Sequence, residues 1–380
     1  MNKEILDNAK RIVIKVGTNV LRNDDGETAL SRIYSFIEDI SKLVKEGKEV
    51  ILVTSGAVGL GKKRLNLDST DGVAIKQACA AIGQGKLMSI YSQGFDTFGV
   101  IVAQILLTED DFHARKKYLS LRTTMTRLLE LGVVPIINQN DTVSTVELDD
   151  LMEERLVCFS DNDKLSALVA SELDADLLIL LSDINGLYND NPKTNPDAQI
   201  IREVNEVTDE ILSYGTDASE GGRGGMKTKL QAAQLVTRSG GRVLITNGKI
   251  PYIIGKIFSG EDIGTVFHPT GENLNEKRRW IGYATNIIGK IKINDLAKEA
   301  ILDKKKSLLP IGVIEVINEF KQAEVVSILD EQDNEIARGM VNYPSEDIKK
   351  IIGCHSDDIT KILGYKNYDA VITRDNITEL

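Results

Sequence analysis

The sequence predicts an α/β protein: an open αβα sandwich with a mostly parallel central sheet, followed by a small C-terminal β-rich domain. Two observations predict this. Through the first two-thirds of the chain, short β-branched runs alternate with segments of helical periodicity, as expected of parallel strands covered by helices. After residue 268 the apolar runs become shorter and include a hairpin signal, which is typical of a separate small domain.

Six apolar runs are predicted to form buried parallel strands. After the first strand, apolar residues from Ile33 to Val44 recur at helical spacing, and Gly47 stands where a helix C-cap belongs. A further helix is expected over Lys164–Leu173, after Ser160-Asp161-Asn162-Asp163, which is equally consistent with a simple N-cap. The six runs are Ile12–Val16, Val50–Thr54, Val100–Leu107, Val133–Asn138, Leu177–Ser182 and Val243–Thr246.

The two domains are expected over residues 1–270 and 281–380, with a linker around Glu276–Trp280. Polar residues at Glu331-Gln332-Asp333-Asn334 predict a hairpin turn within the second domain. Its predicted strands are Gly289–Ile293, Gly312–Ile317, Glu324–Leu329 and Ile336–Val341.

Composition restricts the possible partners. The net charge is −11, and residues 281–380 carry 13 Lys and Arg against 17 Asp and Glu, a net −4. Both values disfavour nucleic acid as a partner. Three widely spaced cysteines suggest neither a disulfide framework nor a zinc site. Met1–Lys10 has no apolar signal region and no run is long enough to span a bilayer. We therefore expect a cytoplasmic protein without membrane contact.

Four of the six predicted strands end in small or polar residues. Because ligands of open α/β sheets bind beyond the carboxyl ends of the strands, these ends predict one common site. Two alternatives stay open: Asn138–Asp141 is also typical of an Asx turn, and Ser182-Asp183 of a simple turn. The four ends are Gly17-Thr18, Ser55-Gly56, Asn138 and Ser182-Asp183.

Two glycine-containing segments suggest a phosphate site. Gly221–Lys229 and Val13–Asn19 combine glycine with lysine, and glycines allow backbone N–H groups to surround a polyphosphate. Neither is a P-loop or a dinucleotide-binding fingerprint. Lys15 lies inside an apolar strand, where burial is costly unless an anion pairs with it. Lys227 and Lys229 are also consistent with solvated lysines at a helix end.

The chain offers no obvious catalytic base. His113, His268 and His355 are isolated from one another and from cysteines, so spacing supports no metal site. A carboxylate acceptor has a pKa of about 4 and is already ionised at neutral pH. Phosphoryl transfer to a carboxylate needs only positioning, magnesium and positive charge, which two lysines and an aspartate could supply.

Six segments resemble motifs of the amino acid kinase family, in the family's order and over residues 10–268. They are VIKVGTNVL, VTSGAVGLG, IINQNDTVST, DNDKLSALVA, LLSDINGLY and GGRGGMKTKLQAA. The match is closest to the members that phosphorylate glutamate. The later segments SLLPIGV and ARGMVNYPSEDI resemble the PUA domain that many of those bacterial enzymes carry.

The resemblance implies ATP-dependent phosphorylation of the γ-carboxylate of L-glutamate, the first step of proline biosynthesis. It implies Mg²⁺ bound mainly through the ATP phosphates, with no metal ligands from the protein. Lys15 and Lys229 would stabilise the moving phosphoryl group, with Asp163 holding both. It further implies glutamate binding by Ser55, Gly56, Asn138, Asp141 and Asn162, and ATP binding by Lys15, Ser182, Asp183, Gly224, Gly225, Met226, Lys227, Thr228 and Lys229.

The family also suggests a homo-oligomer and feedback inhibition by proline. Three features depart from its pattern: a longer segment at Val146–Ser160, Gln139 in place of glutamate, and Lys227 in place of serine or threonine. Two alternative functions remain. One is an amino acid kinase that accepts N-acetylglutamate or aspartate, and the other is an RNA-binding regulator acting through the PUA domain.

Overall fold

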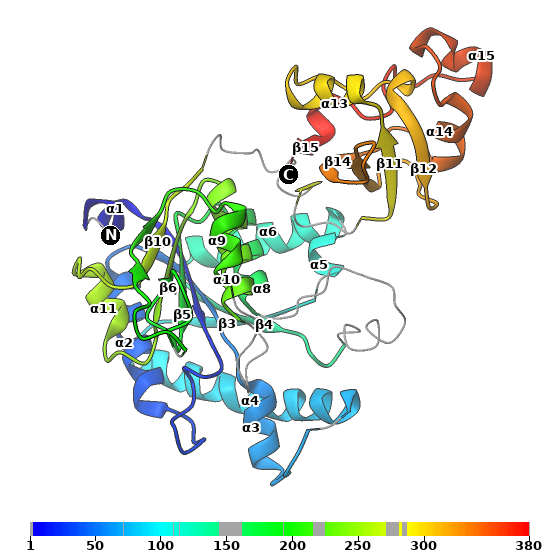
Figure 1. Cartoon of the computed structure of the whole chain (residues 1–380). Helices are drawn as coiled ribbons and strands as arrows, with labels where there is room; N and C mark the ends of the chain where they lie inside the picture. Colours follow the sequence, from blue (N-terminus) through cyan, green and yellow to red (C-terminus); the bar gives the residue numbers. More distant parts are fainter. Residues whose placement is uncertain are drawn as a thin grey trace. The chain divides into compact units, whose positions relative to one another are not determined.

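A computed structural model describes residues 3–379 except 71, 109, 114, 144–161, 193, 216–224, 271–280 and 283–286. The chain divides into two compact units, Met1–Asp111 with Arg115–Asn273, and Phe112–Ala114 with Leu274–Leu380 (Figure 1). The predicted linker Glu276–Trp280 and the segment Val146–Ser160 lie outside the described residues. Residues 1–270 and 281–380 remain our proposed domain limits.

The first unit is built on an eight-stranded sheet in the order β3-β4-β2-β1-β5-β9-β10-β8. The six strands from β3 to β9 are parallel, so the predicted α/β class and mostly parallel sheet are confirmed. All six predicted strands are present, with ends shifted by two residues at most. They are β1 (Arg11–Val16), β2 (Glu49–Val53), β3 (Val102–Leu107), β4 (Val134–Gln139), β5 (Leu177–Ser182) and β9 (Arg242–Asn247).

Four short strands were not predicted. β10 (Thr265–Phe267) pairs antiparallel with β9, and β8 (Glu203–Val204) extends the sheet beside it. β6 (Leu187–Tyr188) and β7 (Ile200–Ile201) form a separate two-stranded ribbon. With two or three residues each, these strands are too short to show a pattern of alternation.

Helices cover both faces of the sheet (Figure 1). α2, α4 and α11 form an apolar core with one face, which receives the even-numbered β1 residues Ile12, Ile14 and Val16. Because side chains alternate along a strand, Lys15 faces the opposite side, where α8 packs. The helices are α1 (Lys3–Asn8), α2 (Leu30–Lys45), α3 (Ala57–Arg64), α4 (Val73–Thr97), α5 (Asp110–His113), α6 (Arg115–Glu130), α8 (Asn162–Glu172), α9 (Asp209–Ser213), α10 (Met226–Arg238) and α11 (Ile253–Phe258).

Both predicted helices are present. α2 ends before Gly47, whose φ of 86° is the left-handed conformation expected after a helix. α8 (Asn162–Glu172) begins two residues before the predicted Lys164–Leu173 and ends one residue before its end. The proposed cap at Ser160 and Asp161 lies outside the described residues.

α3 and α4 pack with unusually close backbones. A Cβ atom at Gly83 of α4 would lie 1.8 Å from the carbonyl oxygen of Ala57, and one at Gly61 of α3 would lie 1.9 Å from that of Cys79. Only glycine allows this approach without a shift of backbone. The contact fixes α3, whose preceding residues Ser55 and Gly56 follow β2.

The second unit has its own sheet, in the order β12-β11-β13-β14-β15, and its own apolar core. The four predicted strands are confirmed as β11 (Gly289–Ile293), β12 (Val313–Ile317), β13 (Val325–Leu329) and β14 (Glu335–Met340). The predicted turn joins β13 to β14, and Asp330 Oδ1 accepts hydrogen bonds from the backbone N–H groups of Gln332 and Asn334. Elements that we did not predict are β15 (Ile377–Glu379), α13 (Asp295–Leu302), α14 (Ser345–Ile351), α15 (Ile359–Leu363) and 3₁₀ turns at Pro310–Gly312, Ser356–Asp358 and Arg374–Asn376.

Within the described part of the chain, no helix has both the length and the apolar character needed to cross a membrane.

The α3–α4 contact predicts a difference between two glycines of the same helix. Gly83→Ala should lower the free energy of unfolding by about 1–3 kcal/mol, because its methyl group meets a backbone carbonyl. Gly85→Ala is the matched control, since nothing lies within 4 Å of a Cβ there. It should leave stability unchanged or raise it slightly. Urea unfolding measures both, and equal stability of the two variants would contradict the described packing.

Candidate active site

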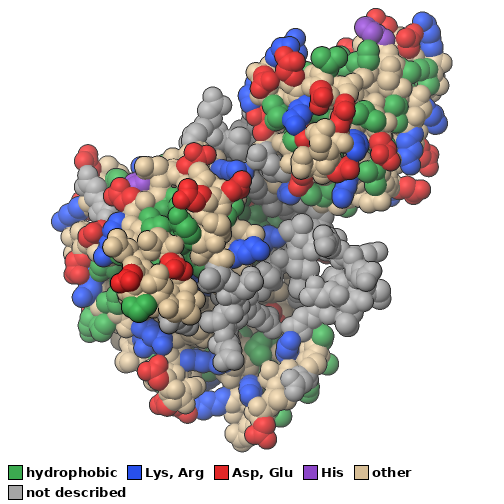
Figure 2. Space-filling view, in the orientation of Figure 1, with side chains coloured by type: hydrophobic (Ala, Val, Ile, Leu, Met, Phe, Trp, Pro, Cys, Tyr) green, Lys and Arg blue, Asp and Glu red, His purple; other side chains and the backbone are tan. Residues whose placement is uncertain are grey.

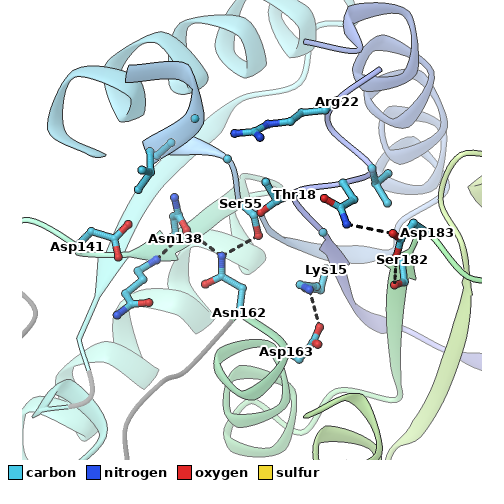
Figure 3. Close-up of a pocket in the computed structure, with 18 of the residues that line it drawn as sticks. Lys15, Thr18, Arg22, Ser55, Asn138, Asp141, Asn162, Asp163, Ser182 and Asp183 are labelled. Atoms are coloured by element: carbon cyan, nitrogen blue, oxygen red, sulfur yellow. Dashed lines mark hydrogen bonds and ion pairs between the residues drawn. The ribbon is translucent and has the colours of Figure 1, made fainter. Parts of the chain in front are cut away.

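The carboxyl ends of the central strands surround a pocket of about 380 Å³ (Figure 3). Residues after β1, β2, β4 and β5 line it, including all four strand ends that the sequence singled out. The prediction of one common site is therefore confirmed in its geometry. The lining residues from these ends are Gly17, Thr18, Ser55, Gly56, Asn138, Ser182 and Asp183.

Three buried charges lie at the floor of this pocket. Asp163, in the first turn of α8, lies between two lysines: its Oδ1 is 2.5 Å from Lys15 Nζ, and its Oδ2 is 3.1 Å from Lys229 Nζ. Thr228 Oγ1 donates a further hydrogen bond of 3.0 Å to Oδ2. The exposed fractions are 0% for Asp163 and 6% for each lysine. The alternative of a solvated helix-end lysine is therefore wrong for Lys229.

The electrostatics of this cluster leave an excess of positive charge. Burial alone raises the pKa of the Asp163 carboxyl, but the charges of Lys15 and Lys229 outweigh burial and hold that pKa well below its ordinary value. Asp163 is therefore ionised, and its single negative charge lies between the two ammonium groups of Lys15 and Lys229. Because these three side chains together carry a net positive charge, the cluster is suited to stabilise an anion in the pocket.

A network of amides lies beside the charged cluster. Asn162 Nδ2 donates to Thr54 O at 2.7 Å, to Ser55 Oγ at 2.9 Å and to Asn138 Oδ1 at 3.1 Å. Asn138 in turn donates to Gln84 Oε1 of α4 at 2.9 Å. These bonds join α8 to two strand ends and to α4, so the polar side chains of this end are held in fixed positions.

The segment after β4 combines a turn with pocket residues. The backbone N–H of Val143 donates to the backbone oxygen of Asn140 at 3.2 Å, so residues 140–143 form a turn closed by the backbone, whereas an Asx turn is closed by a side-chain oxygen. Asn138, Gln139 and Asp141 nevertheless line the pocket. Figure 3 shows Asp141 and Asn138 on the side of the pocket away from Ser182 and Asp183.

The end of β5 carries a second carboxylate. Asp183 accepts hydrogen bonds from Asn19 Nδ2 at 3.0 Å and from Ser182 Oγ at 3.3 Å. Partial burial raises the pKa of Asp183, but these hydrogen bonds, with the charge of Lys229, bring it below its ordinary value. Asp183 is thus a carboxylate at neutral pH, exposed at the mouth of the pocket.

The late glycine segment is only partly described. Gly224 lies outside the described residues, and Gly225 precedes α10. Met226 and Lys227 open α10 without lining the pocket, and Lys227 is exposed. The solvated-lysine alternative thus fits Lys227, two residues before the buried Lys229.

Several lining residues escaped the sequence analysis, namely Asn19, Arg22, Lys62 and Lys76, as did Gln84 behind Asn138. Asn19 could have been found, because it directly follows the strand end Gly17-Thr18. Lys62 lies in α3 and Lys76 in α4. In the sequence, a single lysine within a helix cannot be distinguished from one that faces solvent. Among the described residues, no group of three His, Cys, Asp or Glu side chains is arranged to hold a metal ion.

Comparison with known proteins matches both units. The amino acid kinase family model matches residues 10–247, and the PUA domain model matches residues 289–363. A glutamate 5-kinase of Thermoanaerobacter sp. (strain X514) is 43% identical over 372 residues, which cover 97% of this chain and 98% of that protein. One from Nostoc sp. is 44% identical over 376 residues, covering 98% and 97%. One from Geobacter sulfurreducens is 42% identical over 382 residues, covering all of both chains.

The charged cluster predicts a pH-dependent loss of stability. Asp163→Asn should lower the free energy of unfolding by about 3–5 kcal/mol at neutral pH, because two ammonium groups stay buried without their partner. The folded pKa of Asp163 lies below the unfolded value of about 3.9. Its contribution is therefore complete above about pH 4 and is lost as the pH falls toward the folded pKa.

Urea unfolding of both proteins across pH tests this. The stability difference should be constant from about pH 8 to pH 5 and shrink below about pH 4. Asp183→Asn, in the same pocket but exposed, is the control and should change stability little. A stable Asp163→Asn protein, or a difference that grows on acidification, would contradict the described electrostatics.

Proposed function

The chain belongs to the amino acid kinase family, and we propose that it transfers the γ-phosphoryl group of ATP to the γ-carboxylate of L-glutamate. The product is L-glutamyl 5-phosphate, and the reaction is the first step of proline biosynthesis. The observation that carries the proposal is the buried Lys15–Asp163–Lys229 cluster, with its excess positive charge, at the floor of the pocket. Relatives named glutamate 5-kinase, similar over nearly the whole chain, support the choice of acceptor.

The transfer requires charge stabilisation and alignment. A γ-carboxylate oxygen of glutamate attacks the γ-phosphorus of ATP, the bond from that phosphorus to the β–γ bridging oxygen breaks, and ADP leaves. Lys15 and Lys229 stabilise the negative charge on the phosphoryl oxygens during transfer. Asp163 holds both ammonium groups in position. The acceptor is already ionised at neutral pH, so no general base is needed.

The two substrates approach the cluster from different sides of the pocket. The proposed glutamate side comprises the amide network and its neighbours, with charge-assisted hydrogen bonds orienting the acceptor. The proposed ATP side comprises the end of β5 and the start of α10. The glutamate residues are Ser55, Gly56, Asn138, Asp141 and Asn162, and the ATP residues are Lys15, Ser182, Asp183 and Gly224–Lys229, with Met226 and Lys227 proposed on the resemblance alone.

We propose that Mg²⁺ enters with ATP, bound mainly through the phosphates. Asp163 is engaged with two lysines. Among the pocket residues that the structure describes on the proposed ATP side, Asp183 is the other carboxylate, and it could contact such an ion directly or through water. Magnesium characteristically keeps several waters and takes one or two carboxylates together with substrate phosphates. Its charge would neutralise the phosphates during transfer.

Further proposals concern location and assembly. We propose a cytoplasmic homo-oligomer inhibited by proline, as the family resemblance implies. Exposed Ile101 and Leu131, near the unpaired edge strand β3, support a self-association surface. The net charge of −4 over residues 281–380 disfavours RNA as a partner. Figure 2 is consistent with this, because acidic and basic side chains are intermixed on the visible face of the C-terminal unit.

An acceptor comparison tests the proposed function. With Mg-ATP, the chain should form acyl phosphate, trapped as hydroxamate, from L-glutamate and far less from N-acetylglutamate or L-aspartate. N-acetylglutamate differs from glutamate in its acylated amino group, and L-aspartate has a shorter side chain, so neither would match a pocket suited to glutamate. Turnover with either of them but not with glutamate would overturn the acceptor assignment, and no turnover with any would overturn the kinase assignment.

The charged cluster predicts the effect of removing either lysine. Lys15→Ala and Lys229→Ala should each lower kcat by about 10²–10³, the usual scale for losing one group that stabilises transition-state charge. Lys45→Ala in α2 is the control, because its side chain is exposed, does not line the pocket and has no proposed role in binding. Steady-state kinetics measures all three, and near-normal turnover after loss of Lys15 or Lys229 would remove that lysine from the mechanism.

A further inference from the structure

The proposed glutamate side of the pocket has an unassigned charge. L-glutamate carries two carboxylates and one ammonium group at neutral pH. On the proposed function, which this inference deepens, the γ-carboxylate faces the lysine cluster and Asp141 attracts the ammonium group. The α-carboxylate therefore needs a cation of its own. Among the described residues, three cations line the pocket outside the buried cluster, namely Arg22, Lys62 and Lys76.

Arg22 occupies a space that a glycine provides. A Cβ atom at Gly59, in α3, would lie 1.7 Å from Nη2 and 2.8 Å from Cζ of Arg22. The guanidinium therefore lies directly against the backbone of α3, in a position that a side chain at residue 59 would occupy. Gly59 has no left-handed backbone angle, so the space that it leaves for the guanidinium is the described consequence of having glycine at this position.

The loop that carries Arg22 is ordered by its own contacts. Arg22 forms a β-bridge with Thr28, and its carbonyl accepts a hydrogen bond of 3.1 Å from Arg32 Nη1. The acidic residues of this loop have other partners. Glu27 forms an ion pair with Lys63, and Asp24 Oδ1 lies 3.3 Å from Lys249 Nζ. The Asp25 side chain accepts a hydrogen bond from the backbone N–H of Glu27.

The guanidinium itself has no hydrogen-bond or ion-pair partner within the described residues. Figure 3 shows Arg22 above and the Lys15–Asp163 pair below, with Ser55 and Thr18 between them. A dicarboxylate that spans the pocket would thus meet positive charge at both of its ends.

We propose that Arg22, seated against Gly59, binds the α-carboxylate of the acceptor and makes the enzyme select an α-amino acid over analogues that lack this charge. Arginine is favoured over Lys62 and Lys76 because its planar fork matches a carboxylate with two parallel hydrogen bonds. The backbone of Gly59 also limits the positions open to the guanidinium on one side, which lowers the entropy lost on binding.

The test compares L-glutamate with L-isoglutamine, its α-amide, which keeps the γ-carboxylate and the ammonium group. Arg22→Ala should raise the KM for glutamate about tenfold or more, the scale of a charge-assisted hydrogen bond. It should leave kcat/KM for isoglutamine and the KM for ATP nearly unchanged. The preference for glutamate over isoglutamine should therefore collapse.

Gly59→Ala provides an independent variant that keeps the arginine. The added methyl group meets only the movable end of Arg22, and alanine favours the helix, so the fold should persist with the guanidinium displaced. The same loss of preference is expected, and the Arg22→Ala, Gly59→Ala double variant should be no worse than either single one. Gly85→Ala, in an open helical position, is the control and should keep the wild-type preference.

The outcomes separate this inference from the proposed function. If the wild-type chain does not phosphorylate glutamate, the proposed function fails and the assignment of Arg22 fails with it. If it does, and Arg22→Ala affects both acceptors equally, raises mainly the KM for ATP or changes nothing, only the assignment fails. A selective loss of preference in Lys62→Ala or Lys76→Ala, but not in Arg22→Ala, would transfer the role to that lysine.

Discussion

The carboxylate of Asp163 is the group on which the site depends, because it holds two ammonium groups in a region nearly closed to water. The three charges come from three elements packed together: β1 at the centre of the sheet, and the first turns of α8 and α10. One carboxylate fixes both lysines yet cannot neutralise both. The fold thereby maintains a fixed positive site without the large reorganisation that solvent would need.

The rest of the pocket supports this centre. Asn162 lies directly before Asp163 in the first turn of α8 and bonds to the ends of β2 and β4, and Asn138 extends the network to α4. The close α3–α4 contact at Gly61 and Gly83 then holds the wall that faces the proposed acceptor. Asn162, proposed for acceptor binding, and Asp163, which holds the two lysines, are neighbours in one helix. The position of the acceptor site is therefore fixed relative to the position of the charged cluster.

The sequence was sufficient for the central architecture and for most of the site. An apolar run that ends abruptly in small or polar residues, such as Gly17-Thr18, Ser55-Gly56 or Asn138, can be recognised in the sequence as a buried strand and its end. A lysine inside such a run can be recognised in the same way. Residues contributed by helices carry no such signal: Lys62 and Lys76 line the pocket, and Gln84 supports Asn138 behind it, only because of how α3 and α4 pack. Lys227 and Lys229 are two residues apart and differ in burial because they face opposite sides of α10, which depends on where that helix begins. β8 and β10 exist through pairing with β9 and its neighbours, not through any pattern of their own.

The most direct test of the charged cluster is a double-mutant cycle in kcat between Lys15→Ala and Lys229→Ala, with folding of each variant verified by its thermal transition. Removing either lysine leaves Asp163 paired with the other, so either single change already eliminates the excess positive charge. We therefore predict that the double variant loses little more turnover than the worse single variant, as for residues that act as a unit. Independent, multiplicative losses, about 10⁴–10⁶-fold in total if each single loss is 10²–10³, would contradict the claim that the three charges act as one centre.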